Sequence, residues 1–168
     1  MHRLGVTRIH DVPAAAIESV YRSRYISFLG LGYALLGNTD QARDAVQETF
    51  ATALRARSSF RGDGSLDGWL WQTMLNVCRQ EHRRRARFAD ADPPELSANG
   101  HASEWPELRA AVAALPDRER TTVFLHYYAE LTHEEAAEAL GVQPGTVAAA
   151  LNHARSKLRR ALETEVTP

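Results

Sequence analysis

The sequence predicts an all-α protein of two small helical domains joined by a flexible acidic linker, the second domain containing a helix-turn-helix. Apolar residues recur every three or four positions along most of the chain, and no segment alternates as a strand would. Residues 88–105 include two prolines and few apolar side chains, which is typical of a linker. We therefore expect domains at residues 1–87 and 106–168.

Three helices are expected in the first domain, over residues 13–36, 39–57 and 66–87. Asp11 lies near the start of the first helix, and Thr39 is expected to be the N-cap of the second. The residues expected to face inward from the second helix are Ala42, Ala45, Val46, Phe50, Ala53 and Leu54; those from the third are Trp69, Leu70, Thr73, Met74, Val77 and Cys78. Gly30 and Gly32 each weaken the first helix by roughly 1 kcal/mol unless close packing needs them.

Four helices are expected in the second domain, over residues 105–115, 117–130, 133–140 and 144–163. Thr132 and Glu135 have the spacing of a capping box, which places a helix start at His133. Gly141 ends that short helix and Pro144 begins the last one. This arrangement of two helices around a tight turn is typical of DNA-binding proteins, although helical hairpins without that function are common.

Charge is unevenly distributed along the chain. Residues 1–87 have a net charge of +5, residues 88–107 of −5 and residues 108–168 of −1. Such segregation indicates contact with a polyanion at one site and its exclusion from another. An acidic linker can imitate a nucleic acid, but a solvated tether has the same composition.

Several classes of protein are disfavoured by what the sequence lacks. A single cysteine, Cys78, rules out an internal disulfide, and its place on an apolar stripe indicates a buried thiol. There is no apolar run of about 18 residues, and the start MHRLGVTRIHDVP has no apolar core of signal-peptide length, so we expect a cytoplasmic protein.

The last helix is expected to present an alanine-rich face to DNA. Val147, Leu151, Ala154 and Leu158 recur at helical spacing and face inward, which leaves an opposite surface of Ala148, Ala149, Asn152, His153, Arg155, Ser156 and Arg159. Alanine offers a base only a methyl group, whereas Asn152, His153 and Arg155 can reach base edges or phosphates. Thr146, at the helix N-terminus, suits a phosphate, and Lys157 adds to the basic residues between 155 and 160.

Five arginines cluster at the end of the third helix: Arg79, Arg83, Arg84, Arg85 and Arg87. They can bind phosphates and release counterions. Cations also favour a helix C-terminus for electrostatic reasons alone, but that effect does not need five of them.

Three segments together resemble a bacterial sigma factor of the extracytoplasmic-function group in the sigma-70 family. They are DAVQETFATAL (44–54), SFRGDGSLDGWLWQTMLNVCRQEHRRR (59–85) and ALPDRERTTVFLHYYAELTHEEAAEALGVQPGTVAAALNHARSKLRRAL (114–162). The resemblance implies a promoter-specificity subunit of RNA polymerase with a region 2-like and a region 4-like domain.

The resemblance implies roles for matching residues of the first domain. Asp44, Gln47 and Glu48 would dock on the clamp helices of the polymerase's largest subunit. The loop from Phe60 to Gly68 would capture a flipped base of the minus-ten element, a role that includes Phe60, Arg61, Gly62, Asp63 and Ser65. Trp69 and Asn76 would border that site, with Arg79, Arg83 and Arg84 beside them. An ordinary turn and a core position for Trp69 fit the composition equally well.

For the second domain, the resemblance implies a minus-thirty-five interface made of Thr146, Ala148, Ala149, Asn152, His153, Arg155, Lys157 and Arg159. It also implies contact with the flap of the second-largest subunit and regulation by an anti-sigma factor. Ala148, Ala149 and Ala150 depart from the family, which places basic or hydroxyl side chains there. Either the minus-thirty-five site is recognised mainly through shape, methyl contacts and phosphates, or this domain binds another partner; the departure favours the first.

Catalysis is not indicated by any motif. His133, Glu134 and Glu135 do not form the HExxH zinc pattern, no phosphate-binding loop is present, and we expect no cofactor and no metal. The alternative hypothesis is a stand-alone helix-turn-helix regulator or adaptor that does not bind core polymerase. An effector-binding sensor would need a pocket that the sequence does not reveal.

Overall fold

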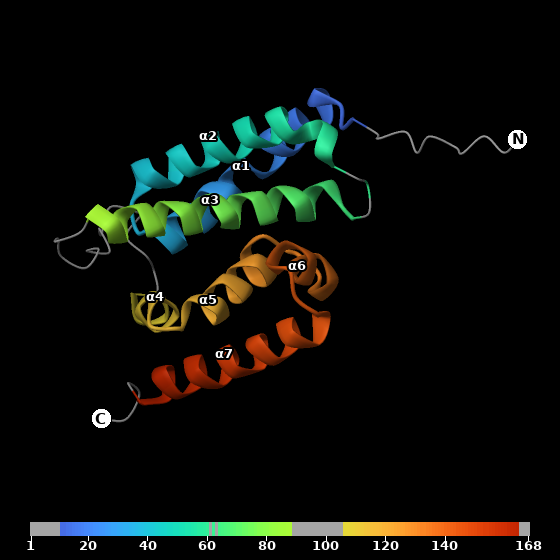
Figure 1. Ribbon diagram of the computed structural model, residues 1–168. Helices are drawn as coiled ribbons and strands as arrows, with labels where there is room; N and C mark the ends of the chain where they lie inside the picture. The colour runs from blue at the N-terminus through green and yellow to red at the C-terminus, as the bar shows by residue number, and fades with distance from the viewer. Residues whose placement is uncertain (1–10, 61, 63, 89–105, 165–168) are drawn as a thin grey trace, which may run out of the picture.

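The computed structural model describes residues 11–60, 62, 64–88 and 106–164, and this part of the chain contains helices and no strand. The first half consists of α1 (Ala14–Leu36), α2 (Thr39–Ala56), the short 3-10 helix η1 (Arg57–Ser59) and α3 (Leu66–Phe88). The second consists of α4 (Pro106–Ala113), α5 (Asp117–Val123), the π-helix η2 (Phe124–Tyr128), α6 (His133–Leu140) and α7 (Pro144–Thr164) (Figure 1). The all-α prediction is confirmed. Apart from Phe88, the expected linker lies outside the described residues.

The N-cap of α2 differs from the predicted one. Gly37 has the left-handed φ of 70° and donates its N–H to the Tyr33 carbonyl at 2.8 Å, which ends α1. Asn38 then has the extended backbone of an N-cap and its side chain accepts from the Gln41 N–H at 3.0 Å. The expectation for Thr39 was wrong because Asn38, one residue earlier, already supplies the capping oxygen.

Asp11 lies near the start of α1, as expected. Its carboxylate lies 3.4 Å from Arg57 Nε, and Pro13 occupies the N-cap position without a side-chain hydrogen bond. The helix expected over residues 117–130 is present, but its hydrogen-bond pattern changes along its length. Its hydrogen bonds widen into the π-helix η2, and Ala129 N–H reaches the Phe124 carbonyl at 3.0 Å.

Aromatic rings organise the core of the first half. Phe28 of α1 and Trp71 of α3 are stacked with ring centroids 3.8 Å apart, and Phe50 of α2 meets Phe28 edge-on at 5.1 Å. The predicted inward residues of α2 are buried except Leu54, which is 45% exposed. Leu54 faces outward because it falls about a third of a turn from the centre of the buried face. Cys78 is buried, as predicted.

Close helix packing explains the glycine in the second half of α1. A Cβ atom on Gly32 would lie 3.1 Å from the Ala42 Cα of α2 and 2.9 Å from the Met74 Cε of α3. The backbones of α1 and α2 therefore approach each other at a point where any larger residue would push them apart.

The two halves share one continuous core. α3 lies between α1 and α2 on one side and α5 and α6 on the other, with α7 outermost (Figure 1). Buried residues from both halves form a single cluster. Gly30 of α1 allows this contact, because a Cβ there would lie 2.8 Å from Tyr128 Cε1 and 2.9 Å from Phe124 Cζ of η2.

Replacing Gly32 with alanine tests the packing of α1 on α2. Alanine favours the helix, but its methyl group must displace the backbone of α2, so we expect a net loss of about 1–2 kcal/mol in the free energy of unfolding. Urea titration measures this free energy of unfolding. Gly145→Ala is the matched control, because a Cβ on Gly145 of α7 meets no atom within 4 Å. Equal stability of Gly32→Ala and the natural chain would contradict this packing.

Burial protects the cysteine from reaction. Loss of solvation raises the pKa of the Cys78 thiol to about 12. We expect a chromogenic disulfide reagent at pH 8 to modify Cys78 only after denaturant is added, because the thiolate is the reactive form. Stoichiometric modification of the folded chain within minutes would show that α3 is not buried as described.

Candidate functional site

Asp44, Gln47 and Glu48, the residues singled out by the family resemblance, lie together on the exposed face of α2. The buried residues Ala45, Val46 and Thr49 fix the orientation of the helix. Glu48 Oε1 accepts from Thr52 at 2.9 Å and from Arg55 at 2.7 Å, and these bonds lower the pKa of Glu48. Thr52 and Arg55 therefore hold the Glu48 carboxylate in place, and its charge is paired with that of Arg55.

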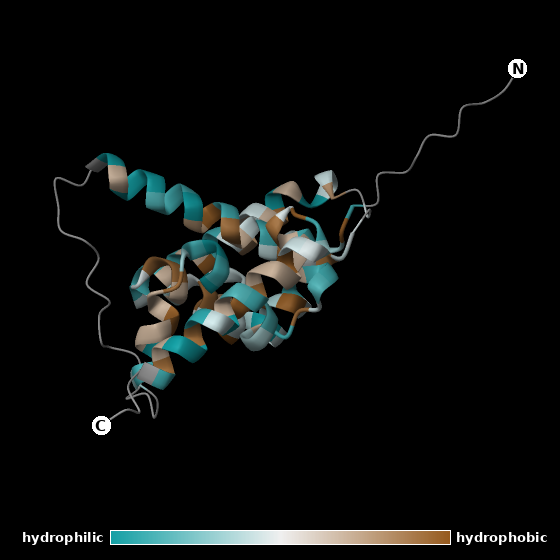
Figure 2. Cartoon of the chain, turned by 90° about the horizontal axis from the view of Figure 1, so that it is seen from below, coloured by the Kyte–Doolittle hydropathy of each residue, from teal (hydrophilic) through white to brown (hydrophobic). Residues whose placement is uncertain are grey.

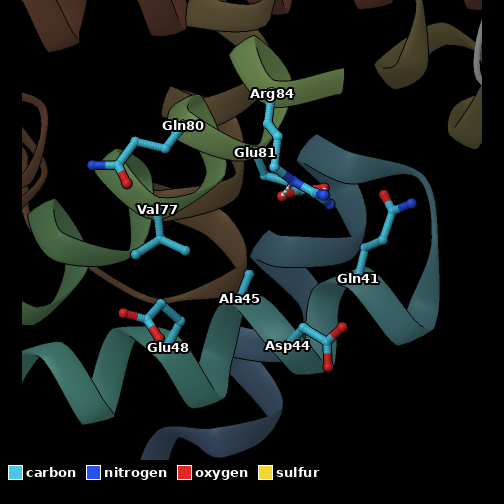
Figure 3. Close-up of a pocket in the computed structure, with 8 residues that line it drawn as sticks. All are labelled: Gln41, Asp44, Ala45, Glu48, Val77, Gln80, Glu81 and Arg84. Atoms are coloured by element: carbon cyan, nitrogen blue, oxygen red, sulfur yellow. Dashed lines mark hydrogen bonds and ion pairs between the residues drawn. The ribbon is translucent and has the colours of Figure 1, made fainter. Parts of the chain in front are cut away.

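A groove of about 260 Å³ separates this acidic face from α3. Asp44 and Glu48 on α2 face Val77, Glu81 and Arg84 on α3 across it (Figure 3). Arg84 forms an ion pair with Glu81 at 2.6 Å, and its hydrogen bond lowers the pKa of Glu81. Arg84, expected beside the minus-ten site, thus lies in the same groove as two of the residues expected to dock on polymerase.

The loop that leads into α3 brings several predicted residues together. The Phe60 ring lies 5.4 Å from the Trp69 ring, and both side chains are half-buried. Ser65 Oγ accepts from the Gly68 N–H at 2.8 Å, as an N-cap side chain does. Gly62 has a left-handed φ of 72°. Arg61 and Asp63 lie outside the described residues.

Trp69 has two environments. One side of it packs against the core cluster and against Phe60, and the rest is accessible. Asn76, two turns further along α3, is exposed and its Oδ1 accepts from Arg79 at 3.1 Å. These residues follow one line along α3 away from the loop.

The five arginines at the end of α3 are not equivalent. Arg85 donates to the Gln41 side chain at 3.0 Å and to the Leu36 carbonyl at 3.4 Å, so it holds the end of α1. Arg79, Arg83 and Arg87 are exposed, and among the described residues Arg83 and Arg87 have no ion-pair partner. The hydrophilic last turns of α3 extend beyond the other helices (Figure 2). This end is open to a polyanion.

The last helix has the expected inward face, with Val147, Leu151 and Ala154 buried. Ala150 is also buried, so the alanine-rich face is narrower than the three consecutive alanines suggest. Outward, Ala149, Asn152, His153, Arg155 and Arg159 are exposed, while Thr146 and Ala148 are half-buried at the start of the helix. These residues form one surface on α7, on the far side of the molecule from α2 (Figure 1).

Tyr127 was not anticipated from the sequence. Its hydroxyl oxygen accepts from Arg155 Nε at 2.6 Å, and the guanidinium carbon lies 5.6 Å from the centre of its ring. Tyr127 itself is 54% exposed. Two adjacent tyrosines before the helix-turn-helix, Tyr127 and Tyr128, could have indicated a surface contact. Only the fold shows that the Tyr127 ring reaches Arg155 of α7.

Lys157 differs from the other basic residues of α7. Its Nζ lies 2.7 Å from Glu119 Oε1 of α5, and the Glu119 side chain is only 14% exposed. This pair fixes α7 on α5 and turns Lys157 away from the surface formed by Asn152 and Arg155.

The described part of the chain shows no other candidate chemistry. Among its helices, none has both the length and the apolar character needed to cross a bilayer. No cluster of three histidine, cysteine or acidic side chains within the described ranges is placed to hold a metal ion.

Comparison with known proteins identifies both halves. Residues 20–88 match the family model described as sigma-70 region 2, and residues 106–158 match sigma-70, region 4. The chain is 35% identical over 139 residues to the ECF RNA polymerase sigma factor EcfG of Rhodopseudomonas palustris, covering 79% of this chain and 77% of that protein. It is 28% identical to the RNA polymerase sigma factor YlaC of Bacillus subtilis, covering 86% and 91%.

Solved structures show the same fold at lower identity. CnrH, solved in complex with the cytosolic domain of CnrY, matches with a TM-score of 0.70 at 21% identity, over 94% of each chain. The sigma factor RpoE of Bartonella quintana, solved with the anti-sigma factor NepR, matches with a TM-score of 0.71 at 21% identity, over 87% of this chain and 98% of that one. The chain therefore belongs to the extracytoplasmic-function sigma factors of the sigma-70 family, and it is an alternative sigma factor that directs RNA polymerase to promoters rather than an enzyme.

Proposed function

We propose that the two halves divide promoter recognition between them: residues 1–87 bind core polymerase and the minus-ten element, and residues 106–168 bind the minus-thirty-five element. The observation that most supports this division is that the exposed faces of α2 and α7 lie on opposite sides of the molecule (Figure 1). Polymerase and duplex DNA would therefore not compete for the same surface. The intervening segment, residues 88–105, would connect the two halves in the complex.

The acidic face of α2 is the proposed docking site for the clamp helices of the polymerase's largest subunit. Asp44, Gln47 and Glu48 are exposed, and the groove beside them offers apolar surface at Ala45 and Val77 together with charged rims. Such a combination suits a helical partner with basic side chains. Contact of α7 with the flap of the second-largest subunit belongs to the same proposal.

The line of residues from Phe60 to Arg83 is the proposed path of the minus-ten strand. Trp69 and Phe60 offer ring surface on which a base can stack, and Asn76 offers hydrogen bonds. Arg79 and Arg83 then hold the phosphates of the same strand. Capture of separated bases stabilises melted DNA, so the proposed role of this path includes promoter opening.

Regulation by an anti-sigma factor is part of the proposal. RpoE, whose fold matches, was solved with the anti-sigma factor NepR, and CnrH was solved with the cytosolic domain of CnrY. Between the two halves of this chain lies a groove of about 420 Å³ lined by Leu35, Leu75, Leu140 and Val142 among others. We also propose that the protein directs transcription in the cytoplasm, where bacterial RNA polymerase works.

The test of polymerase docking is co-migration with bacterial core RNA polymerase on size exclusion. We expect the natural chain to co-migrate and the variant Asp44→Ala, Gln47→Ala, Glu48→Ala to lose binding at least tenfold, because three contacts of a buried interface are removed at once. Glu134→Ala, an exposed acid on α6, is the control and should bind normally. If the natural chain binds duplex DNA but not core, the protein acts as a stand-alone regulator instead.

The face of α7 is tested through the salt dependence of DNA binding, which needs no knowledge of the promoter. Arg155→Ala should reduce the slope of log K against log salt concentration by about 0.9 on a mixed-sequence duplex, because one phosphate contact is lost. Lys157→Gln is the matched control: its partner is Glu119, so we expect reduced stability with the slope unchanged. Equal slopes for Arg155→Ala and the natural chain would exclude Arg155 from the interface.

A further inference from the structure

A side chain from the second half fills the N-terminal end of α3. The carboxylate of Glu138, on α6, lies against Gly64 in the loop before α3 and against Gly68 in the first turn of α3. A Cβ atom on Gly68 would lie 2.6 Å from Glu138 Cδ and 2.7 Å from its Oε2, and a Cβ on Gly64 would collide with Oε1. The carboxylate thus occupies space that exists only because both residues are glycines.

The chemistry of this contact suits an anion. Ser65 Oγ lies 3.3 Å from Glu138 Oε2 and accepts the Gly68 N–H at 2.8 Å, so its own proton is available to the carboxylate. The first N–H groups of a helix have no partner within the helix, and the helix dipole favours a negative charge beside them. Glu138 therefore places a negative charge beside the N-terminus of a helix that belongs to the other half, where it accepts from the Ser65 hydroxyl.

Arg24 holds the two halves together beside the same point. Its guanidinium NH1 donates to the Ala129 carbonyl at the end of η2 at 2.8 Å, and its Nε lies 3.8 Å from Asp67 Oδ1 in the first turn of α3. Gly30 of α1, which the Tyr128 and Phe124 rings contact closely, lies on the same helix as Arg24. The contact of Glu138 is thus one part of an interface, and α6 cannot leave without separating the halves there.

We propose that Glu138 is an internal ligand that closes the loop at residues 64–68 in the free chain. The Ser65 hydroxyl donates to a carboxylate here. The same hydroxyl can donate to other oxygen acceptors, including those of a nucleic acid. The inhibitory consequence rests on the proposed function, which assigns this loop to the minus-ten strand. Glu138 then competes with DNA for the half-buried Ser65 hydroxyl, so full engagement of this loop by a promoter strand requires α6 to withdraw and the two halves to separate.

Hydrogen exchange of the full chain tests the contact without any polymerase or DNA. In Glu138→Gln, which keeps the shape and removes the charge, we expect the amides of residues 64–69 to exchange about two- to fivefold faster. In Glu138→Lys the same amides should exchange faster still, because the helix dipole repels a positive charge at the N-terminus of α3. Glu134→Gln, an exposed acid on the same helix, is the matched control and should exchange like the natural chain.

Gly68→Ala tests the contact from the other side. The added methyl group displaces the Glu138 carboxylate while alanine favours α3, so we expect faster exchange at residues 133–140 of α6 with no loss of helix in α3. The proposal is overturned if Glu138→Gln exchanges like Glu134→Gln and Gly68→Ala leaves α6 unchanged.

A second measurement separates the contact from its consequence. Binding of a fluorescein-labelled, mixed-sequence single-stranded oligonucleotide is followed by anisotropy. We expect Glu138→Gln to bind at least twofold more tightly than Glu134→Gln. Faster exchange without tighter binding would overturn the inhibitory role while leaving the contact itself and polymerase docking intact. Loss of polymerase docking with tighter oligonucleotide binding would instead contradict the proposed function alone.

Discussion

The burial of α3 on two sides is the constraint on which the rest of the structure depends. On one side, Trp71 stacks on Phe28 with ring centroids 3.8 Å apart, and Met74 packs between α1 and α2. On the other side, α3 contacts α6 of the second half. Because both sides are covered, only the two ends of α3 and one narrow exposed line are left for other molecules.

As a result, the two ends of α3 differ in their accessibility to other molecules. The C-terminal end extends beyond the other helices and keeps Arg83 and Arg87 open to a polyanion (Figure 2). The N-terminal end is partly covered, because Glu138 of α6 lies against Gly64 and the buried Gly68. The same helix therefore presents an open basic end, proposed to hold phosphates, and an opposite end where Glu138 occupies part of the surface beside the proposed base-binding residues. Under the proposed function, binding of a strand along the full length of α3 would displace Glu138 and move the two halves apart.

Much of this structure could be predicted from the sequence, because helical periodicity is a local property. The helices, the capping box at Thr132 and the buried faces of α2 and α7 follow from residues three or four positions apart. The π-helix at Phe124–Tyr128 could not be predicted, since its sequence also suits an ordinary helix. The exposed faces of α2 and α7 could be predicted from the same helical spacing.

Contacts between distant residues were beyond sequence reasoning. Ser65 and Glu138 are 73 positions apart, and nothing local in either segment indicates that they meet. For the same reason, the arginine cluster and the basic end of α7 looked uniform, although Arg85 holds the end of α1 and Lys157 is paired with Glu119. The composition of a basic segment predicts a charged surface, but the partners of each cation depend on the tertiary fold.

The most direct test of the account is hydrogen exchange of the natural chain, free and bound to core RNA polymerase. Docking through α2 predicts slower exchange over residues 40–52 in the complex. Release of Glu138 predicts faster exchange over residues 64–69 in the same sample. Unchanged exchange in α2 would contradict the docking face, and slower or unchanged exchange at residues 64–69 would contradict the opening of α3 on which the account depends.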